Sequence, residues 1–570
     1  MILTFPRWAG KGGSRGARTG STANEATAAL RGEAPVPRTD RRDGSTARTE
    51  AMRYRWFPLV PLAAVVVILA SAGVLPTWPG LVHLVALPPL DLYGDIRVLL
   101  TTTSTVPSLV LSLLAVFVLR TVVLSLMMGG LTRDRVALAA TFYGVLLVPW
   151  VLAAELVYMA ETMLYARLFW FGLIAVAVFA LLWAPAPWAA VRRHREIGRG
   201  PRIRDAFTRT WREGPRLSVL LGYVVAVVGV GLLAQQFPAL TIPLVPLSAA
   251  ATAVAITGLT LPVPARPFLR LGATALALVL LSTVWIITRG GESVEATEPR
   301  EGSLLLMSGI NSRSGSGDMF GTDPAFLGYS CEQTYYFSYA GQGEGQPQGQ
   351  ALCPIHSGSP YTEGHTQRPF DEQVEVFAEQ VQDLPRPLVV AGHSHGVWVA
   401  WKAAASGAAP EVDALILVGA FPESTGGYRA PGEDGKGRPA SDLLHLLIPL
   451  GSVFGFDLAP DAPGPRELLG STERPAEIFA LPLPEHTRTL KTPSSTDLPL
   501  KPSGWRMDVD RNACPIRTPH AYLPTTPAYY NEVNRFLDGE PPPACPVAFD
   551  WGGPLTLPFG TPTVLVEHPD

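Results

Sequence analysis

The residues best placed to do chemistry surround Ser394, in the run LVVAGHSHG at residues 388–396. An apolar strand leads into the pattern Gly-x-Ser-x-Gly, and a helical stretch follows it. Gly392 and Gly396 leave room where the strand and the helix cross, so the serine can occupy a tight, strained turn. The backbone N–H of His395 then points to where an oxyanion would form. The run predicts a nucleophilic serine at position 394.

The motif alone is weak evidence, because a Gly-rich chain of this length contains on the order of a few tenths of a chance match. A second Gly-x-Ser-x-Gly does occur at residues 12–16, GGSRG. Its flanking sequence predicts no strand before it and no helix after it. The context of Ser394, rather than the pattern, therefore supports the prediction.

A parallel sheet is expected to position this serine. Short apolar runs predict strands at residues 304–307, 335–339, 388–391 and 414–418. Helical stretches are predicted at about 370–381 and 395–406, so strands and helices alternate. This alternation predicts an α/β domain with a mostly parallel sheet covered by helices.

These features resemble the α/β-hydrolase superfamily over about residues 303–538. In that family a strand ending in His-Gly-X supplies a second oxyanion N–H, and the matching segment here is LLLMSGIN at residues 304–311. The resemblance implies that the backbone N–H of Ile310 is this donor. Ser308 stands where the family has its histidine, which is a departure from the pattern, although the donor itself is a backbone group.

The family's chain order of serine, acid and histidine implies the remaining catalytic residues. His520 precedes a predicted terminal helix at residues 527–537 and is the expected general base. Asp497 follows the strand predicted at 488–492 and is the expected acid, with Asp508 and Asp510 as alternatives. The family also commonly inserts a lid, here expected at residues 420–479. Its apolar stretch within 442–456 would cover the site, dip into the membrane surface or form an ordinary core helix.

All four cysteines lie in the C-terminal half of the chain, and none of their spacings matches a zinc or redox site. An even number confined to one domain predicts disulfides in an oxidising compartment, with four buried free thiols as the alternative. Local closure favours two pairs, although three pairings are open. The favoured pairs are Cys331 with Cys353 and Cys514 with Cys545.

The N-terminal half is predicted to be a membrane domain. Residues 1–55 carry eleven Lys or Arg against five acidic residues and predict a disordered basic tail. Seven apolar stretches then follow, each long enough to span a bilayer. They lie near residues 56–76, 105–128, 136–160, 167–190, 217–235, 240–262 and 267–288, with the fifth and sixth set apart by Gln235, Gln236 and Pro238 and the sixth interrupted by Pro243 and Pro246.

The arginines predict the orientation of these spans. The basic tail, the loop with Arg133 and Arg135, the loop 192–216 with nine arginines and the loop with Arg266 and Arg270 are expected in the cytoplasm. The intervening loops, including 77–104, are poor in basic residues. Seven spans therefore place the C-terminal half outside the membrane, the side that the cysteines also favour.

Two ionisable residues lie within the predicted spans, Arg120 and Glu155. They could form a buried pair or line a polar path, but the favoured interpretation is a structural pair or a position near the helix ends, because no chain of ionisable residues continues either position. His393 and His395 could be imagined as metal ligands. We expect them to shape the pocket, because no third ligand lies nearby.

The sequence therefore predicts a tail at 1–55, a bundle at 56–288, a linker at 289–302, a catalytic domain at 303–540 and a Pro-rich tail at 541–570. The expected function is a multi-pass, extracytoplasmic serine hydrolase that acts through an acyl-enzyme. No cofactor or metal is expected. The expected partners are the lipid bilayer and a lipid, ester or acylated envelope substrate, and the net charge of −3 argues against nucleic acid. The alternatives are an acyltransferase on an envelope lipid or glycan, and a transporter or sensor whose outer domain only binds.

Overall fold

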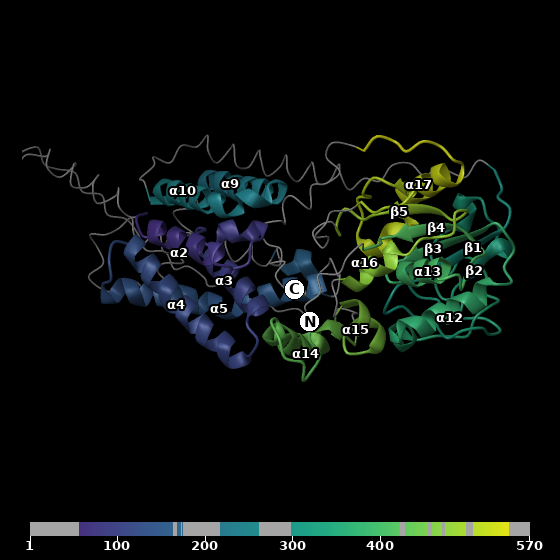
Figure 1. The fold of residues 1–570 in the computed structure, drawn as a ribbon, viewed down its shortest axis with the longest axis horizontal. Coiled ribbons are helices and arrows are strands. Elements are labelled where there is room, and N and C mark those ends of the chain that lie inside the picture. The colour runs from purple at the N-terminus through teal and green to yellow at the C-terminus, as the bar shows by residue number, and fades with distance from the viewer. Residues whose placement is uncertain are drawn as a thin grey trace, which may run out of the picture. The chain divides into compact units, whose positions relative to one another are not determined.

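Figure 1 shows a computed structural model of the chain. The structure describes residues 56–162, 168–172, 174, 217–260, 298–421, 428–453, 459–469, 473–497 and 506–545. The basic tail, most of the span predicted at 167–190, the span predicted at 267–288 and the arginine-rich loops at 192–216 and 266–270 lie outside these residues. So does most of the predicted C-terminal tail.

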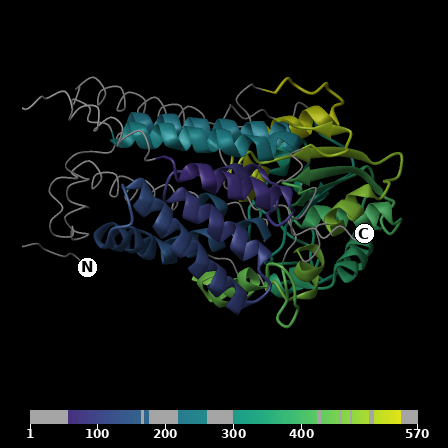
Figure 2. The ribbon, with the colours of Figure 1, turned by 60° about the vertical axis from the view of Figure 1, so that its left-hand side comes forward.

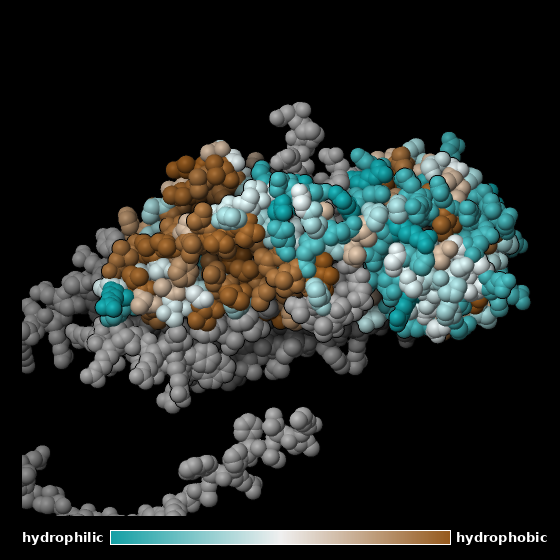
Figure 3. All heavy atoms as spheres, turned by 90° about the horizontal axis from the view of Figure 1, so that it is seen from below, coloured by the Kyte–Doolittle hydropathy of each residue, from teal (hydrophilic) through white to brown (hydrophobic). Residues whose placement is uncertain are grey.

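The N-terminal half is helical, and its long helices expose apolar side chains. Within the described residues, three helices are long and apolar enough to cross a membrane: Val106–Met127, Arg133–Glu161 and Thr241–Leu259. Hydrophobic side chains gather on the surface of these helices, whereas the visible face of the C-terminal half is mostly hydrophilic (Figure 3). An apolar surface of this kind indicates membrane association. The helices are α2 (Leu59–Ser71), α3 (Leu90–Thr102), α4 (Val106–Met127), α5 (Arg133–Thr162), α9 (Leu217–Gln236) and α10 (Thr241–Thr260).

Helices α9 and α10 lie side by side in both ribbon views and contact each other extensively (Figure 2). The short 3-10 helix Pro238–Leu240 separates them, as the sequence predicted from Gln235, Gln236 and Pro238. Pro246 lies inside α10 without ending it, so the expected interruption is absent there. Helix α2 is shorter than its predicted span. Its 13 residues cover roughly 20 Å, against about 30 Å for a bilayer core.

The region 77–104, expected to be a loop, contains the 3-10 helix Pro79–His83 and the buried helix α3. Helix α3 explains Arg120, because it brings two carboxylates to that guanidinium. Nε of Arg120 lies 2.6 Å from Asp95, and Nη1 lies 3.6 Å from Asp91. Arg120 is thus paired structurally, as favoured, but not with Glu155. Both Glu155 oxygens are buried without a hydrogen-bond partner among the described residues.

The C-terminal half contains a six-stranded parallel sheet with the order β2-β1-β3-β4-β5-β6. Strands β3 and β4 are buried along almost their whole length, as expected of parallel strands covered by helices. Helix α13 packs against both α12 and α16, and α17 packs on β5. The strands are β1 (Ser303–Met307), β2 (Thr334–Tyr336), β3 (Leu388–His393), β4 (Val412–Val418), β5 (Arg488–Thr492) and β6 (Arg511–Asn512).

The predicted elements of this half are largely found, with two differences at the sheet edges. Strand β2 ends at Tyr336 rather than Tyr339, and the two-residue strand β6 was not predicted. The helices α12 (Phe370–Val381), α13 (Gly396–Ala405) and α17 (Pro527–Leu537) match the predicted ranges closely. The expected insertion contains α14 (Arg438–Val453), α15 (Pro463–Leu469) and α16 (Glu473–Ala480). On α14, Leu444 is buried and Leu446 is exposed, and its role as a lid stays a prediction.

Both expected disulfides are formed. Cys331 is bonded to Cys353, and Cys514 is bonded to Cys545, and no free cysteine remains. The pairing is the one that local closure favours. Two disulfides indicate an oxidising, extracytoplasmic environment for this half of the chain.

Replacing both Cys331 and Cys353 by serine is expected to lower the free energy of unfolding by about 3 kcal/mol, the chain-entropy value for a loop of this size. The two residues are 22 positions apart. Thermal unfolding of the detergent-solubilised protein, with the wild type under non-reducing conditions as the reference, measures the difference. Rapid maleimide labelling of unreduced, folded wild-type protein would contradict the disulfides themselves.

Candidate active site

Ser394 occupies a strained turn between β3 and α13. Its φ of 55° lies in the left-handed region, which is uncommon for a residue with a side chain. The turn is held by its backbone, because the Ser394 N–H donates to the Val418 carbonyl at 2.8 Å and the Val397 N–H donates to the Ser394 carbonyl at 3.1 Å. Strain at a single residue with such firm support is typical of a functional position.

The two glycines of the motif lie where the sequence analysis requires small residues. A Cβ on Gly392 would lie 3.2 Å from the backbone of Gly396, and a Cβ on Gly396 would lie 2.9 Å from the Ser308 carbonyl oxygen. Strand β3, helix α13 and the end of β1 therefore approach one another at backbone distance. A side chain at position 396 would force the backbone to shift, and one at position 392 would be tightly packed against it.

The segment after β1 lies against the serine. A Cβ on Gly309 would be 2.9 Å from Ser394 Cβ, which places the Gly309 backbone beside the nucleophile. Ile310, the predicted oxyanion donor, follows directly. The strand order reverses between β1 and β3, and the crevice at such a switch point is where parallel sheets bind ligands.

Side chains fix this segment from outside. The Ser312 hydroxyl donates to the Gly309 carbonyl at 2.6 Å, and the Asn311 N–H donates to the Thr366 hydroxyl at 2.9 Å. Asn311 has a φ of 61°, so the chain turns sharply just after Ile310. The Asn311 amide is thus already engaged. The amides of Ile310 and His395 make no backbone hydrogen bond in this described region, which suits groups that receive an anion.

His520 and Asp497 are joined directly, through Nδ1 of the imidazole and Oδ2 of the carboxylate. Asp497 is fully buried, and its Oδ1 has no hydrogen-bond partner among the described residues. A carboxylate only accepts, so Nδ1 of His520 carries the proton. In the neutral ring, Nε2 is then free to accept a proton, which is the tautomer that a general base requires.

Two loops hold the acid and the base together. The Ser494 hydroxyl donates to the Thr518 carbonyl at 2.6 Å, and the Ser495 N–H donates to the Ile516 carbonyl at 2.9 Å. The loop after β5 is therefore fastened to the chain just before His520. These bonds, which sequence patterns do not reveal, explain why residues 23 positions apart meet.

The alternative acids lie elsewhere. Asp510 accepts from the backbone N–H of Thr489 at 2.7 Å and from its hydroxyl at 2.9 Å, so it supports the contact between β5 and β6. Asp508 is exposed. Of the three candidates from the sequence, the structure brings only Asp497 to His520.

Three residues that the sequence analysis did not assign to the base surround the His520 ring. A Cβ on Gly419 would lie 2.6 Å from its Cε1, Phe421 stacks on it with the ring centroids 5.4 Å apart, and the His393 ring lies 4.6 Å away. Gly419 follows β4 with a φ of 66°. The His520 imidazole therefore packs against the backbone of Gly419, at the carboxyl end of the sheet. The hydroxyl of Ser394 makes no hydrogen bond to His520 in this described site, and such bonds often tighten only when substrate binds.

His395 lies in an aromatic enclosure. Its imidazole is buried among the rings of Tyr339, Phe370 and Trp398, and both nitrogens lack a partner within the described residues. Burial lowers the pKa of His395 to about 3, so the ring is neutral at ordinary pH. No cluster of three metal-ligating side chains occurs in the part of the chain that the structure describes.

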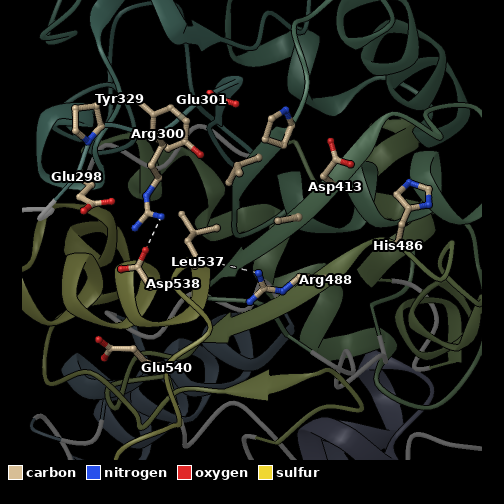
Figure 4. Close-up of a pocket in the computed structure, with 14 residues that line it drawn as sticks. Glu298, Arg300, Glu301, Tyr329, Asp413, His486, Arg488, Leu537, Asp538 and Glu540 are labelled. Atoms are coloured by element: carbon tan, nitrogen blue, oxygen red, sulfur yellow. Dashed lines mark hydrogen bonds and ion pairs between the residues drawn. The ribbon is translucent and has the colours of Figure 1, made fainter.

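A separate hollow of ≈ 670 Å³ lies at the opposite, amino-terminal edge of the sheet (Figure 4). Two of the arginines that line it already have partners within the protein. Arg300 points to Asp538, with 2.7 Å between Nη1 and Oδ1, and Arg488 donates to the Leu537 carbonyl (Figure 4). Since Ser394 follows the carboxyl end of β3, this hollow is not part of its site.

Comparisons with protein-family models, with curated proteins and with solved structures find no match. The function is therefore inferred from the geometry of the site itself.

Proposed function

We propose that the chain is a membrane-tethered serine hydrolase of the α/β-hydrolase type, which cleaves carboxylic esters outside the membrane. The observation that carries the proposal is the meeting of a strained serine turn with a tautomer-fixed His–Asp pair at one edge of a parallel sheet. In this proposal the bundle crosses the membrane seven times, with its N-terminus in the cytoplasm.

The chemistry proceeds in two balanced steps. Nε2 of His520 removes the Ser394 proton as Oγ attacks the ester carbonyl, and the amides of His395 and Ile310 stabilise the oxyanion. The imidazolium returns the proton to the leaving alcohol, which leaves an acyl-enzyme. Water, deprotonated by the same histidine, then attacks the acyl group. The imidazolium returns that proton to Oγ of Ser394 as the acyl–oxygen bond breaks, which releases the acid and restores the enzyme.

A fluorophosphonate probe tests the proposal on the full-length protein in membranes. We expect one covalent adduct, mapped by mass spectrometry to the peptide that contains Ser394. Its formation requires both an activated serine and an oxyanion site. Absence of an adduct from folded, disulfide-bonded protein, or an adduct on another residue only, would refute the proposal.

Substitution of Gly309 by alanine is expected to slow this labelling by about 10²-fold, the cost of displacing a reacting group by about 1 Å. The new Cβ would lie 2.9 Å from Ser394 Cβ and 3.0 Å from the His393 carbonyl oxygen, both of which are fixed by backbone. Gly321→Ala is the matched control, since its Cβ would have no neighbour nearer than 3.5 Å. Equal labelling rates for the two variants would show that Gly309 does not adjoin the nucleophile.

A further inference from the structure

A second histidine, His393, lies beside the base and is not used by the steps above. It is the last residue of β3 and directly precedes Ser394. Its Nε2 lies 3.0 Å from the carbonyl oxygen of His520, and the two imidazole centroids are 4.6 Å apart. The bond therefore connects the backbone of the nucleophile's turn to the residue that carries the base.

The hydrogen bond to the His520 carbonyl determines which nitrogen of the His393 imidazole carries the proton. A carbonyl oxygen can only accept, so Nε2 of His393 must donate. Burial, and next the charge on His520 when that ring is protonated, lower the pKa of His393 to about 3. His393 is consequently neutral, with its proton on Nε2, over the range in which ester hydrolysis is measured. A neutral neighbour does not oppose the positive charge that His520 gains during catalysis.

We propose that His393 is a positioning residue, whose Nε2–H holds the His520 carbonyl and thereby sets the separation between the Ser394 hydroxyl and the base. The inference rests on the proposed function. Asp497 fixes the far side of the imidazole, and Gly419 and Phe421 contact its ring. Of these contacts, only the bond from His393 is a side-chain hydrogen bond that originates on the residue next to the nucleophile, so it links the two partners of the proton transfer directly.

Two substitutions of His393 distinguish the effect of its N–H donor from that of its aromatic ring. His393→Phe keeps an aromatic ring and removes the N–H, whereas in His393→Gln the amide Nε2 lies the same number of bonds from Cα as Nε2 of histidine. We expect His393→Phe to lower kcat and the fluorophosphonate labelling rate constant about tenfold, the worth of one hydrogen bond, with KM unchanged. The glutamine variant should recover most of the loss.

The control is His486→Phe, which removes a bond of the same kind at the opposite edge of the sheet, where Nε2 of His486 lies 2.9 Å from the Pro410 carbonyl oxygen. It should label at the wild-type rate. Rate constants, rather than extents, are compared because they report only on folded molecules. Wild-type rates for His393→Phe, or equal losses for His393→Phe and His393→Gln, would overturn the positioning role while leaving the hydrolase proposal standing. An unlabelled wild type would overturn both.

Discussion

Replacing Ser394 by alanine is expected to abolish fluorophosphonate labelling and to lower ester hydrolysis by about 10⁶-fold, as removal of a serine nucleophile does elsewhere. The alanine keeps the backbone of the turn, with its bonds to Val418 and Val397. Folding and disulfide formation should therefore be unaffected. The loss would isolate the hydroxyl as the reacting group.

The chain supplies its own matched control for this substitution. Ser14 lies in the other Gly-x-Ser-x-Gly, whose flanking sequence predicts neither a strand nor a helix, so Ser14→Ala removes a serine from the same pattern alone. It should label and hydrolyse at wild-type rates. If Ser394→Ala labels as strongly as the wild type, the assignment of the nucleophile is wrong, because another residue must then react with the probe.

The strand, turn and helix around Ser394 could be predicted from sequence because local rules specify them. Apolar runs bounded by turn residues marked β1, β3 and β4 to within two residues, and β5 was placed by the chain order of the family that the sequence resembles. The glycines of the motif predicted a backbone crossing, and the close approach of Gly392 to Gly396 confirms it. A close approach of two backbone segments can be predicted in this way because it requires glycine at defined positions.

Features that depend on distant segments could not be predicted in this way. Strand β6 is two residues long and is supported by the Asp510 contact to Thr489, which no local pattern encodes. Helix α3 was expected to be a loop, and its carboxylates Asp91 and Asp95 find their cation, Arg120, on another helix. No sequence pattern marked Gly419 as part of the site. Its role is visible only once β4 brings it under His520.

The choice among Asp497, Asp508 and Asp510 shows the same limit. All three follow β5 and precede His520, so chain order cannot separate them. The fastening of Ser494 to Thr518 decides the matter in the structure, because it carries Asp497 to the imidazole and leaves Asp510 beside Thr489. Substitution of each carboxylate by its amide converts this difference into a measurement.

Asp497→Asn is expected to lower kcat by about 10⁴-fold, the loss seen when an asparagine replaces the acid of a serine-protease triad. The amide is nearly isosteric, so Ser394, His520 and the buried site keep their places. Its NH₂ group, however, donates to Nδ1 of His520 and drives the ring proton to Nε2. The ring then has no lone pair facing Ser394, and labelling slows together with hydrolysis.

Asp510→Asn is the comparison, because it makes the same chemical change one loop away. It weakens the bonds to Thr489 that join β5 to β6, so it should lower the unfolding temperature while kcat changes only a few-fold, the size of a single hydrogen bond. Measuring kcat and thermal unfolding for both variants separates catalysis from stability. A larger loss of kcat in Asp510→Asn than in Asp497→Asn would mean that the acid has been assigned to the wrong loop, since only a carboxylate on Nδ1 of His520 can hold the tautomer that the base requires.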